Sequence, residues 1–267
     1  MVTSLGSPVK YNLPLDNELL ELNPYLGKPI ALRYQGEIHC IECGRKTSKS
    51  YNQGFCYPCF QSLASCDLCI MKPETCHYHL GTCRQPEWGE THCFQDHYVY
   101  LANSSGLKVG ITRGTQIPTR WIDQGASQAM PLFRVSNRLI SGQLEMAIKQ
   151  HVSDRTDWRK MLKGSPDAVD LTIRSHEILE LADEEIKRIE SEHGKDNITH
   201  MEDAEPVDIQ YPVLEYPEKV KSFNFDKTPE IAGVLQGIKG QYLILDTGVL
   251  NIRKFAGYSI EFSATDA

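Results

Sequence analysis

The cysteines constrain the fold of this sequence most, because all nine lie between Cys40 and Cys93 of a 267-residue chain. A disulfide framework for the whole chain would be spread more widely, whereas clustered cysteines in a reducing compartment indicate metal or redox chemistry. The N-terminus has no basic stretch followed by an apolar run, and no segment approaches the roughly 20 apolar residues of a membrane span. We therefore expect a cytoplasmic protein with no membrane partner.

The first group of cysteines consists of two CxxC pairs. Cys40 and Cys43 are followed, after twelve residues, by Cys56 and Cys59. Two such pairs can bring four thiolates to one tetrahedral Zn²⁺ at about 2.3 Å. Gly44 follows the first pair, where the backbone has to turn back toward the metal. The spacing predicts a structural zinc site, and the alternative is two pairs of redox type.

The second group is denser and offers more ligands than one tetrahedral ion can use. We predict a second structural zinc ion here, bound by Cys66, Cys69, Cys76 and Cys83. The spacings match neither common ferredoxin pattern, and some of these cysteines could be ordinary buried residues. The section has few large aliphatic side chains, so metal binding would supply its folding free energy. Other side chains that could complete this site are His77, His79, His92 and Cys93.

The charge is unevenly distributed, although the composition is ordinary for a globular protein, with 40% hydrophobic and 24% charged residues. Residues 1–165 carry 18 Lys and Arg against 14 Asp and Glu, and residues 166–267 carry 10 against 21, so charges of +4 and −11 make up the net charge of −7. The first part could approach a phosphate backbone. The acidic second part would repel nucleic acid, and it could contact a protein partner instead.

Residues 96–165 alternate short strands with helices. Turn residues at 103–106 separate two apolar runs, and Pro118 suits the first turn of a helix that reaches about Gly125. A second helix, which Ser141 can cap, carries Leu144 and Ile148 on one face. The predicted strands are residues 98–102, 108–112 and 132–135.

Four motifs follow one another in this section: Tyr98-Val99-Tyr100, Lys108-Val109-Gly110, Arg120-Trp121 and Glu145. Their order resembles the GIY-YIG endonuclease superfamily, particularly divergent members with Lys in place of the second motif tyrosine. The resemblance implies a small β-β-α-β-α domain over about residues 96–157, and Mg²⁺ or Mn²⁺ as the catalytic ion. The overall pattern also resembles an uncharacterised bacterial family that joins such a domain to a zinc-binding N-terminus.

The resemblance implies catalytic roles for Tyr100, Arg120 and Glu145. Phosphodiester hydrolysis needs an activated water, a cation near the developing charge and a carboxylate that holds a metal. Tyr100 could help to activate the water, Arg120 could stabilise the phosphate oxygens, and Glu145 could hold the ion. A modest basic patch of Lys108, Arg113 and Arg120 could contact nucleic acid, either DNA or RNA.

Each of these residues has an alternative interpretation. Tyr100 could simply pack in a strand, and Gly110 could serve only a close approach of backbone to helix. Arg120 could be an ordinary surface charge, and Glu145 a solvated helix carboxylate. Nearby, Asp154 and Asp157 could support the site, although a helix cap is the preferred interpretation.

The sequence therefore predicts an α+β protein in five parts. A lead-in (1–35) ends in a strand at 30–34, and a zinc-ribbon-like region (36–95) and the GIY-YIG-like domain (96–165) follow. An acidic helix at 169–189 and a loose linker make up residues 166–230, and a small antiparallel β-meander fills 231–267. The sequence predicts a zinc-containing protein that binds nucleic acid and could be a metal-dependent endonuclease. The alternative is a non-catalytic, zinc-containing adaptor that binds nucleic acid or protein.

Overall fold

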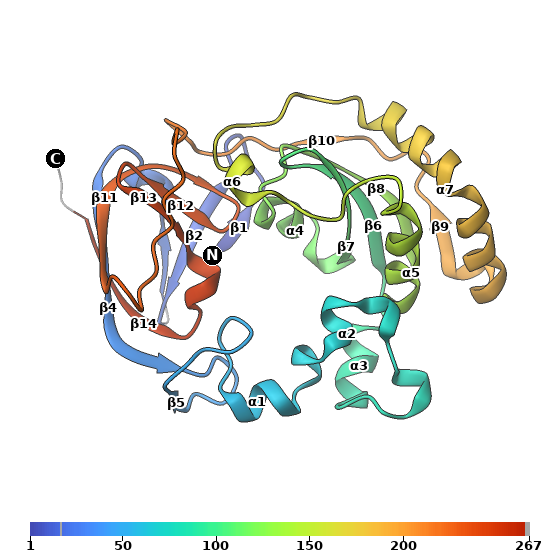
Figure 1. Ribbon diagram of the computed structural model, residues 1–267, viewed down its shortest axis with the longest axis horizontal. Coiled ribbons are helices and arrows are strands. Elements are labelled where there is room, and N and C mark those ends of the chain that lie inside the picture. The colour runs from blue at the N-terminus through green and yellow to red at the C-terminus, as the bar shows by residue number, and fades with distance from the viewer. Residues whose placement is uncertain (17, 265–267) are drawn as a thin grey trace.

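The computed structural model of the chain describes residues 1–16 and 18–264 and contains three antiparallel sheets. Figure 1 shows the C-terminal sheet on the left, the central sheet on the right and the cysteine-rich segment below both. A small N-terminal sheet packs beside the C-terminal one. Its strands, in the order β1-β2-β3, are β1 (Val2–Ser4), β2 (Lys10–Leu15) and β3 (Glu18–Glu21).

The C-terminal sheet joins residues from both ends of the sequence. Its order is β13-β12-β11-β4-β14, and β5 pairs with the far end of β4. The predicted lead-in strand at 30–34 is thus part of a longer strand that lies between two strands of the predicted C-terminal meander. Its strands are β4 (Pro29–His39), β5 (Lys46–Thr47), β11 (Glu230–Lys239), β12 (Tyr242–Leu245), β13 (Gly248–Asn251) and β14 (Tyr258–Ala264).

The central sheet has the order β10-β8-β6-β7, with β9 pairing with β8 as well. The elements from β6 to α5 follow the strand-strand-helix-strand-helix order that the sequence predicts. The strands are β6 (His97–Asn103), β7 (Leu107–Arg113), β8 (Gln128–Val135), β9 (Ile198–His200) and β10 (Val207–Asp208).

The seven α-helices of the described residues lie around these sheets. The long helix α7 runs along the outer edge beside α5, and α1, α2 and α3 lie in the cysteine-rich segment (Figure 1). None of these helices has the length and apolar character needed to cross a membrane. Their bounds are α1 (Tyr57–Ser62), α2 (Leu68–Met71), α3 (Pro86–His92), α4 (Thr119–Asp123), α5 (Arg138–Ile148), α6 (Trp158–Met161) and α7 (Leu171–His193).

The two faces of the central sheet belong to different cores, because successive side chains of a strand point to opposite faces. Val99, Leu101 and Val109 pack against α5 and α7. Tyr100 and Ala102 point the other way, into the core that the central sheet shares with the N-terminal and C-terminal sheets. The central sheet therefore joins the two halves of the protein.

Two sequence-based expectations differ from the structure. Helix α5 begins three residues before Ser141, because the Asn137 side chain caps it by accepting a hydrogen bond from the Ile140 N–H (3.1 Å). The segment predicted as a loose linker is ordered instead: β9 and β10 pair with β8, and Phe225 is 1% exposed. Its apolar residues are too widely spaced to form a periodic pattern, although the neighbouring sheets bury them.

Candidate metal centre and active site

The first cysteine group comes together where β4 ends. Cys40 follows the last residue of β4, and Gly44, at φ +70°, allows the chain to turn back into β5. Cys56 is the N-cap of α1, and Cys59 lies in its first turn. The sulfur atoms of Cys40, Cys43, Cys56 and Cys59 all lie within 4.8 Å of one another.

The geometry of this cluster fits zinc. Four sulfurs around a tetrahedral ion at about 2.3 Å lie roughly 3.8 Å apart, and the Sγ atoms of Cys43 and Cys56 are separated by 3.7 Å. Burial raises the pKa of the Cys40 thiol, but backbone N–H groups directed at its sulfur outweigh that effect and lower the pKa to about 6. Zinc needs thiolates, so this backbone prepares a ligand. The prediction of a four-cysteine cluster at these positions is confirmed.

The predicted catalytic residues surround one region beside β6 and β7. Tyr100 is fully buried, and its hydroxyl donates a hydrogen bond to Gln124 Oε1 (2.9 Å). Gly110 lies opposite Tyr100 in the strand pair, and a Cβ atom there would meet the Tyr100 hydroxyl at 2.7 Å. Glycine at position 110 is therefore required by the tyrosine ring that covers it.

Charged groups of both signs act on this tyrosine. Burial raises the pKa of Tyr100 to about 12, and the charges of Arg120 and Glu145 oppose each other there. Tyr100, Arg120 and Glu145 come from β6, α4 and α5, so only the tertiary structure brings them together. A tyrosine in this environment stays protonated at neutral pH.

Lys108 lies in the same region and is 4% exposed. Its ammonium donates a hydrogen bond to Thr156 Oγ1 (3.3 Å), from the loop that runs along the edge of β7. Burial lowers the pKa of Lys108 to about 8; the charge of Arg120 lowers it further and that of Glu145 opposes this. Lys108 is thus a buried cation, whereas the sequence suggested an exposed basic patch.

Glu145 is half-buried on α5. Burial raises the pKa of Glu145 to about 7, and the charge of Asp154 adds to this while Lys108 and Lys149 oppose it. A carboxyl group with such a pKa changes its charge near neutrality. This property is common at functional sites, because solvated surface carboxylates keep an ordinary pKa.

A family model described as "Protein of unknown function (DUF2797)" matches residues 27–260. The chain belongs to this family. The DUF2797 match includes both cysteine groups, the central sheet and most of the C-terminal sheet. No curated protein and no solved structure matches the chain.

Arg113 is the last residue of β7, the strand that also carries Lys108. Its charge acts on the pKa of Cys93. Burial lowers the pKa of Arg138, and the charges of Arg113 and Arg120 lower it further. Sequence reasoning missed Gln124 as the partner of Tyr100, because nothing in its neighbourhood marks a glutamine as functional. For Asp154 and Asp157, the sequence favoured a helix cap over a role in the site. Asp157 does cap α6, whereas the charge of Asp154 adds to burial in raising the pKa of Glu145.

The second cysteine group is only partly as predicted. Cys69, Cys76 and Cys83 line one small cavity of about 20 Å³, and Cys93 lines it too. Cys66 is buried at 8% exposure but does not line this cavity. A different trio of possible ligands, Asp67, Cys69 and His77, has its ligand atoms within 4.8 Å of one another.

Proposed function

We propose that this DUF2797 protein binds zinc and nucleic acid, and that its central domain is a GIY-YIG-like endonuclease site that hydrolyses phosphodiester bonds. The proposal depends mainly on one observation. Tyr100, Arg120 and Glu145 occupy motif positions of the resemblance and come from three different elements, and the charges of Arg120 and Glu145 both act on Tyr100 and on Lys108. The strand and helix order from β6 to α5 and the close approach of Gly110 to Tyr100 support it.

Each residue has a chemical role in this proposal. Ionised Glu145 would hold Mg²⁺ or Mn²⁺, with waters completing the coordination, and the ion would activate a water and neutralise charge on the phosphate. Arg120 would bind phosphate oxygens through its guanidinium fork. Lys108 would supply a second, fixed positive charge. Tyr100, protonated and held by Gln124, would orient the attacking water rather than deprotonate it.

The test compares wild type with Glu145→Ala on labelled single-stranded, duplex and branched DNA and RNA. Assays contain Mg²⁺, Mn²⁺ or no added divalent ion, and zinc content is measured on every protein. Glu180→Ala is the matched control, because Glu180 is an exposed glutamate on α7, away from the site. We expect cleavage by wild type and Glu180→Ala, dependence on the divalent ion, and a loss of at least about a hundredfold in Glu145→Ala.

Equal cleavage by wild type and Glu145→Ala would contradict the site assignment. No cleavage of any substrate by zinc-loaded wild type would contradict the endonuclease proposal and favour the second candidate.

The second candidate is a non-catalytic adaptor that binds nucleic acid or a protein partner. Among the described residues, no group of three or more metal-ligating side chains includes Glu145, and the Tyr100 hydroxyl already has a partner. Under this candidate, the affinity for nucleic acid would be unchanged in Glu145→Ala and would decrease in Arg120→Ala. Fluorescence anisotropy with the same oligonucleotides at several salt concentrations measures this difference.

A further inference from the structure

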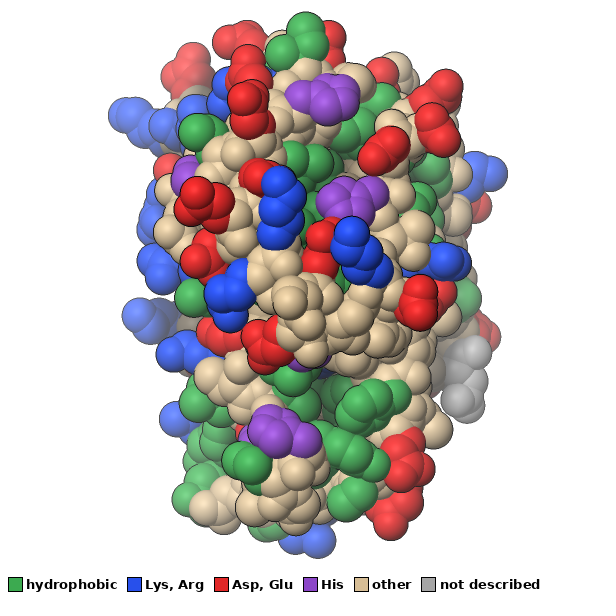
Figure 2. Space-filling model, turned by 90° about the vertical axis from the view of Figure 1, so that its right-hand side faces the viewer, with side chains coloured by type: hydrophobic (Ala, Val, Ile, Leu, Met, Phe, Trp, Pro, Cys, Tyr) green, Lys and Arg blue, Asp and Glu red, His purple; other side chains and the backbone are tan. Residues whose placement is uncertain are grey.

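The second cysteine lobe, residues 64–93, folds without a hydrophobic core of its own. In the described part of the chain, none of its residues belongs to the three hydrophobic clusters. Its large apolar side chains are exposed instead: Leu68 by 60%, Met71 by 77% and Leu80 by 66%. Figure 2 shows hydrophobic side chains gathered on the lower part of one face, where this lobe lies, while charged residues of both signs cover the upper part.

The helices of the lobe are also too short to be stable alone. Helix α2 has four residues and α3 has seven, whereas isolated helices shorter than roughly 12 residues are marginal in water. Something other than apolar burial or helix propensity must therefore hold these segments together.

Four cysteines from four segments line the small cavity of the lobe. Cys69 lies in α2, Cys76 follows a single 3-10 turn (Pro73–Thr75), Cys83 precedes α3, and Cys93 is the C-cap of α3. The cavity has a volume of about 20 Å³. Unlike the sulfurs of the first cluster, no three of these four sulfurs, all of them in described residues, lie within 4.8 Å of one another, so binding one tetrahedral ion would draw them closer together. Gly89 lies against the same cavity: a Cβ atom there would meet the Tyr78 ring at 3.2 Å and would lie in ordinary contact with Cys83 Sγ at 3.6 Å.

Positive charge accompanies these thiols. Burial raises the pKa of Cys93, while the positive charges of Arg138 and Arg113 oppose that rise. Arg138 donates a hydrogen bond to the Ile70 carbonyl (2.6 Å), and its buried Nε has no partner among the described residues. A zinc ion with four thiolates carries a charge of about −2, which two neighbouring guanidinium groups would balance.

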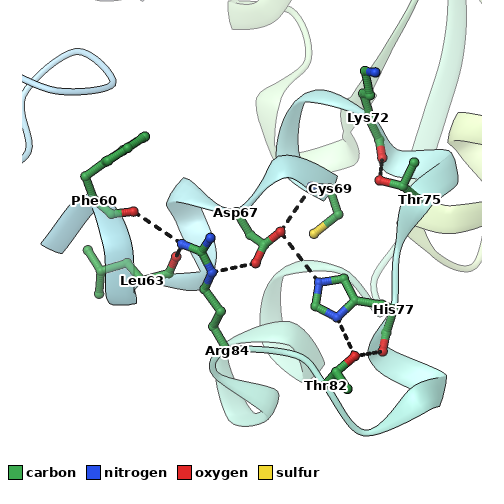
Figure 3. A network of polar contacts seen from close by, with 9 residues as sticks. All are labelled: Phe60, Leu63, Asp67, Cys69, Lys72, Thr75, His77, Thr82 and Arg84. Carbon is green, nitrogen blue, oxygen red and sulfur yellow. Dashed lines mark hydrogen bonds and ion pairs between the residues drawn. The ribbon is translucent and has the colours of Figure 1, made fainter. Parts of the chain in front are cut away.

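The trio of Asp67, Cys69 and His77 is a weaker candidate, because its polar groups already have partners (Figure 3). Asp67 accepts from Arg84 Nε (2.6 Å) and from the Cys69 N–H (3.4 Å). His77 lies with Nε2 at 3.5 Å from Asp67 and Nδ1 at 2.8 Å from the Thr82 hydroxyl. Arg84 in turn donates to the carbonyls of Phe60 and Leu63, so this network ties the lobe to α1.

We propose that Cys69, Cys76, Cys83 and Cys93 bind a second structural zinc ion, and that Cys66, His77 and Asp67 do not coordinate it. Arg138 and Arg113 balance the charge of the site. The proposal does not depend on nuclease activity, because every observation behind it concerns how the lobe is held together.

This zinc site also positions the helix that carries Glu145. The turn Pro73–Thr75, between Cys69 and Cys76, packs directly on α5: a Cβ atom on Gly142 would meet the Glu74 backbone nitrogen at 2.6 Å. The backbone N–H of Arg138, at the start of α5, donates to the carbonyl of Cys93 (2.9 Å). Two ligand-bearing segments thus contact α5 within two turns of Glu145.

The experiment measures metal content and zinc coordination in the full-length protein purified without added metal. Elemental analysis should give about two zinc ions per chain, and X-ray absorption should show a first shell of sulfur alone at about 2.3 Å. Cys83→Ser and Cys93→Ser should each lose about one zinc ion. Cys66→Ser and His77→Ala should keep both ions. Cys43→Ser is the control for the first site, and it should lose about one ion while the second remains.

Several results would overturn the proposal. They are one zinc ion per wild-type chain, iron instead of zinc, or nitrogen or oxygen in the first shell of wild type. Loss of an ion from Cys66→Ser with retention in Cys93→Ser would show a different ligand set. If the serine variants fail to fold, the absorption spectrum of wild type still decides between all-sulfur coordination and a site with Asp67 and His77.

Discussion

The cysteine-rich segment and the sheet-containing body achieve stability by different means. In the body, side chains such as Phe133, Leu144 and Leu243 are fully buried and form continuous apolar clusters. Residues 40–93 contribute nothing to those clusters, and several of their large apolar side chains are exposed. The comparison teaches that burial of apolar area accounts for the stability of the body and not for that of the segment, whose stability we expect to depend on metal binding.

Removal of zinc should have the largest effect, and this effect should be confined to the cysteine-rich segment. Structural zinc sites contribute about 10–16 kcal/mol of apparent binding free energy, which is also folding free energy for the segment. After treatment with a strong chelator, we expect amide protection to be lost across residues 40–93 and retained in β6, β8 and β12. Hydrogen exchange followed by mass spectrometry measures both regions in one sample. Equal loss of protection in the sheets would contradict separate sources of stability.

A cavity in the body should destabilise the sheets and leave zinc binding unchanged. Phe133 is fully buried between the central sheet and the helices that cover it, and Phe133→Ala should lower the free energy of unfolding of the body by about 3–5 kcal/mol. Urea denaturation followed by circular dichroism measures this change. The zinc content of the folded variant should equal that of wild type, and Leu181→Ala, at an exposed position on α7, is the matched control.

The pH dependence of stability should report on Glu145, which lies on α5, the helix that contacts the cysteine-rich segment. The folded-state pKa of Glu145 is raised from 4.5 to about 7, so the folded protein binds more protons than the unfolded chain between these pH values. Stability therefore falls as the pH rises through this range, by about 3 kcal/mol in total. Urea titrations without added Mg²⁺ or Mn²⁺ should show this fall in wild type and not in Glu145→Gln. An unchanged slope in the variant would mean that another group titrates.

The sequence predicted the local parts of the site well. Cys40, Cys43, Cys56 and Cys59 lie close enough in the sequence to imply a shared site, because a single hairpin between the two CxxC pairs is sufficient to bring them together. The strands of the central domain were also predictable, since each has a short apolar run with turn residues beside it. Strand β8 and helix α5 begin several residues earlier than predicted, because cross-strand pairing and the Asn137 cap extend them.

The second cysteine group could not be resolved in the same way. Six or more possible ligands lie within 28 residues, and spacing alone does not say which of them face one cavity. The structure brings Cys93 beside Cys69 because α3 folds back toward α2, and it leaves Cys66 outside the cavity. The pairing of β4 with β11 and β14 was also unpredictable, because it joins segments about 200 residues apart.

By itself, the sequence determined that four cysteines of residues 40–59 form one cluster and that a strand-strand-helix-strand-helix unit follows, since ligand spacing and apolar periodicity are local properties. Only the tertiary structure decided that Tyr100, Lys108 and Glu145 are withdrawn from water within reach of one another's charges or of the charge of Arg120, so that the pKa values of these three groups shift. Such shifts depend on which groups exclude water from one another, and that is fixed when distant segments pack together.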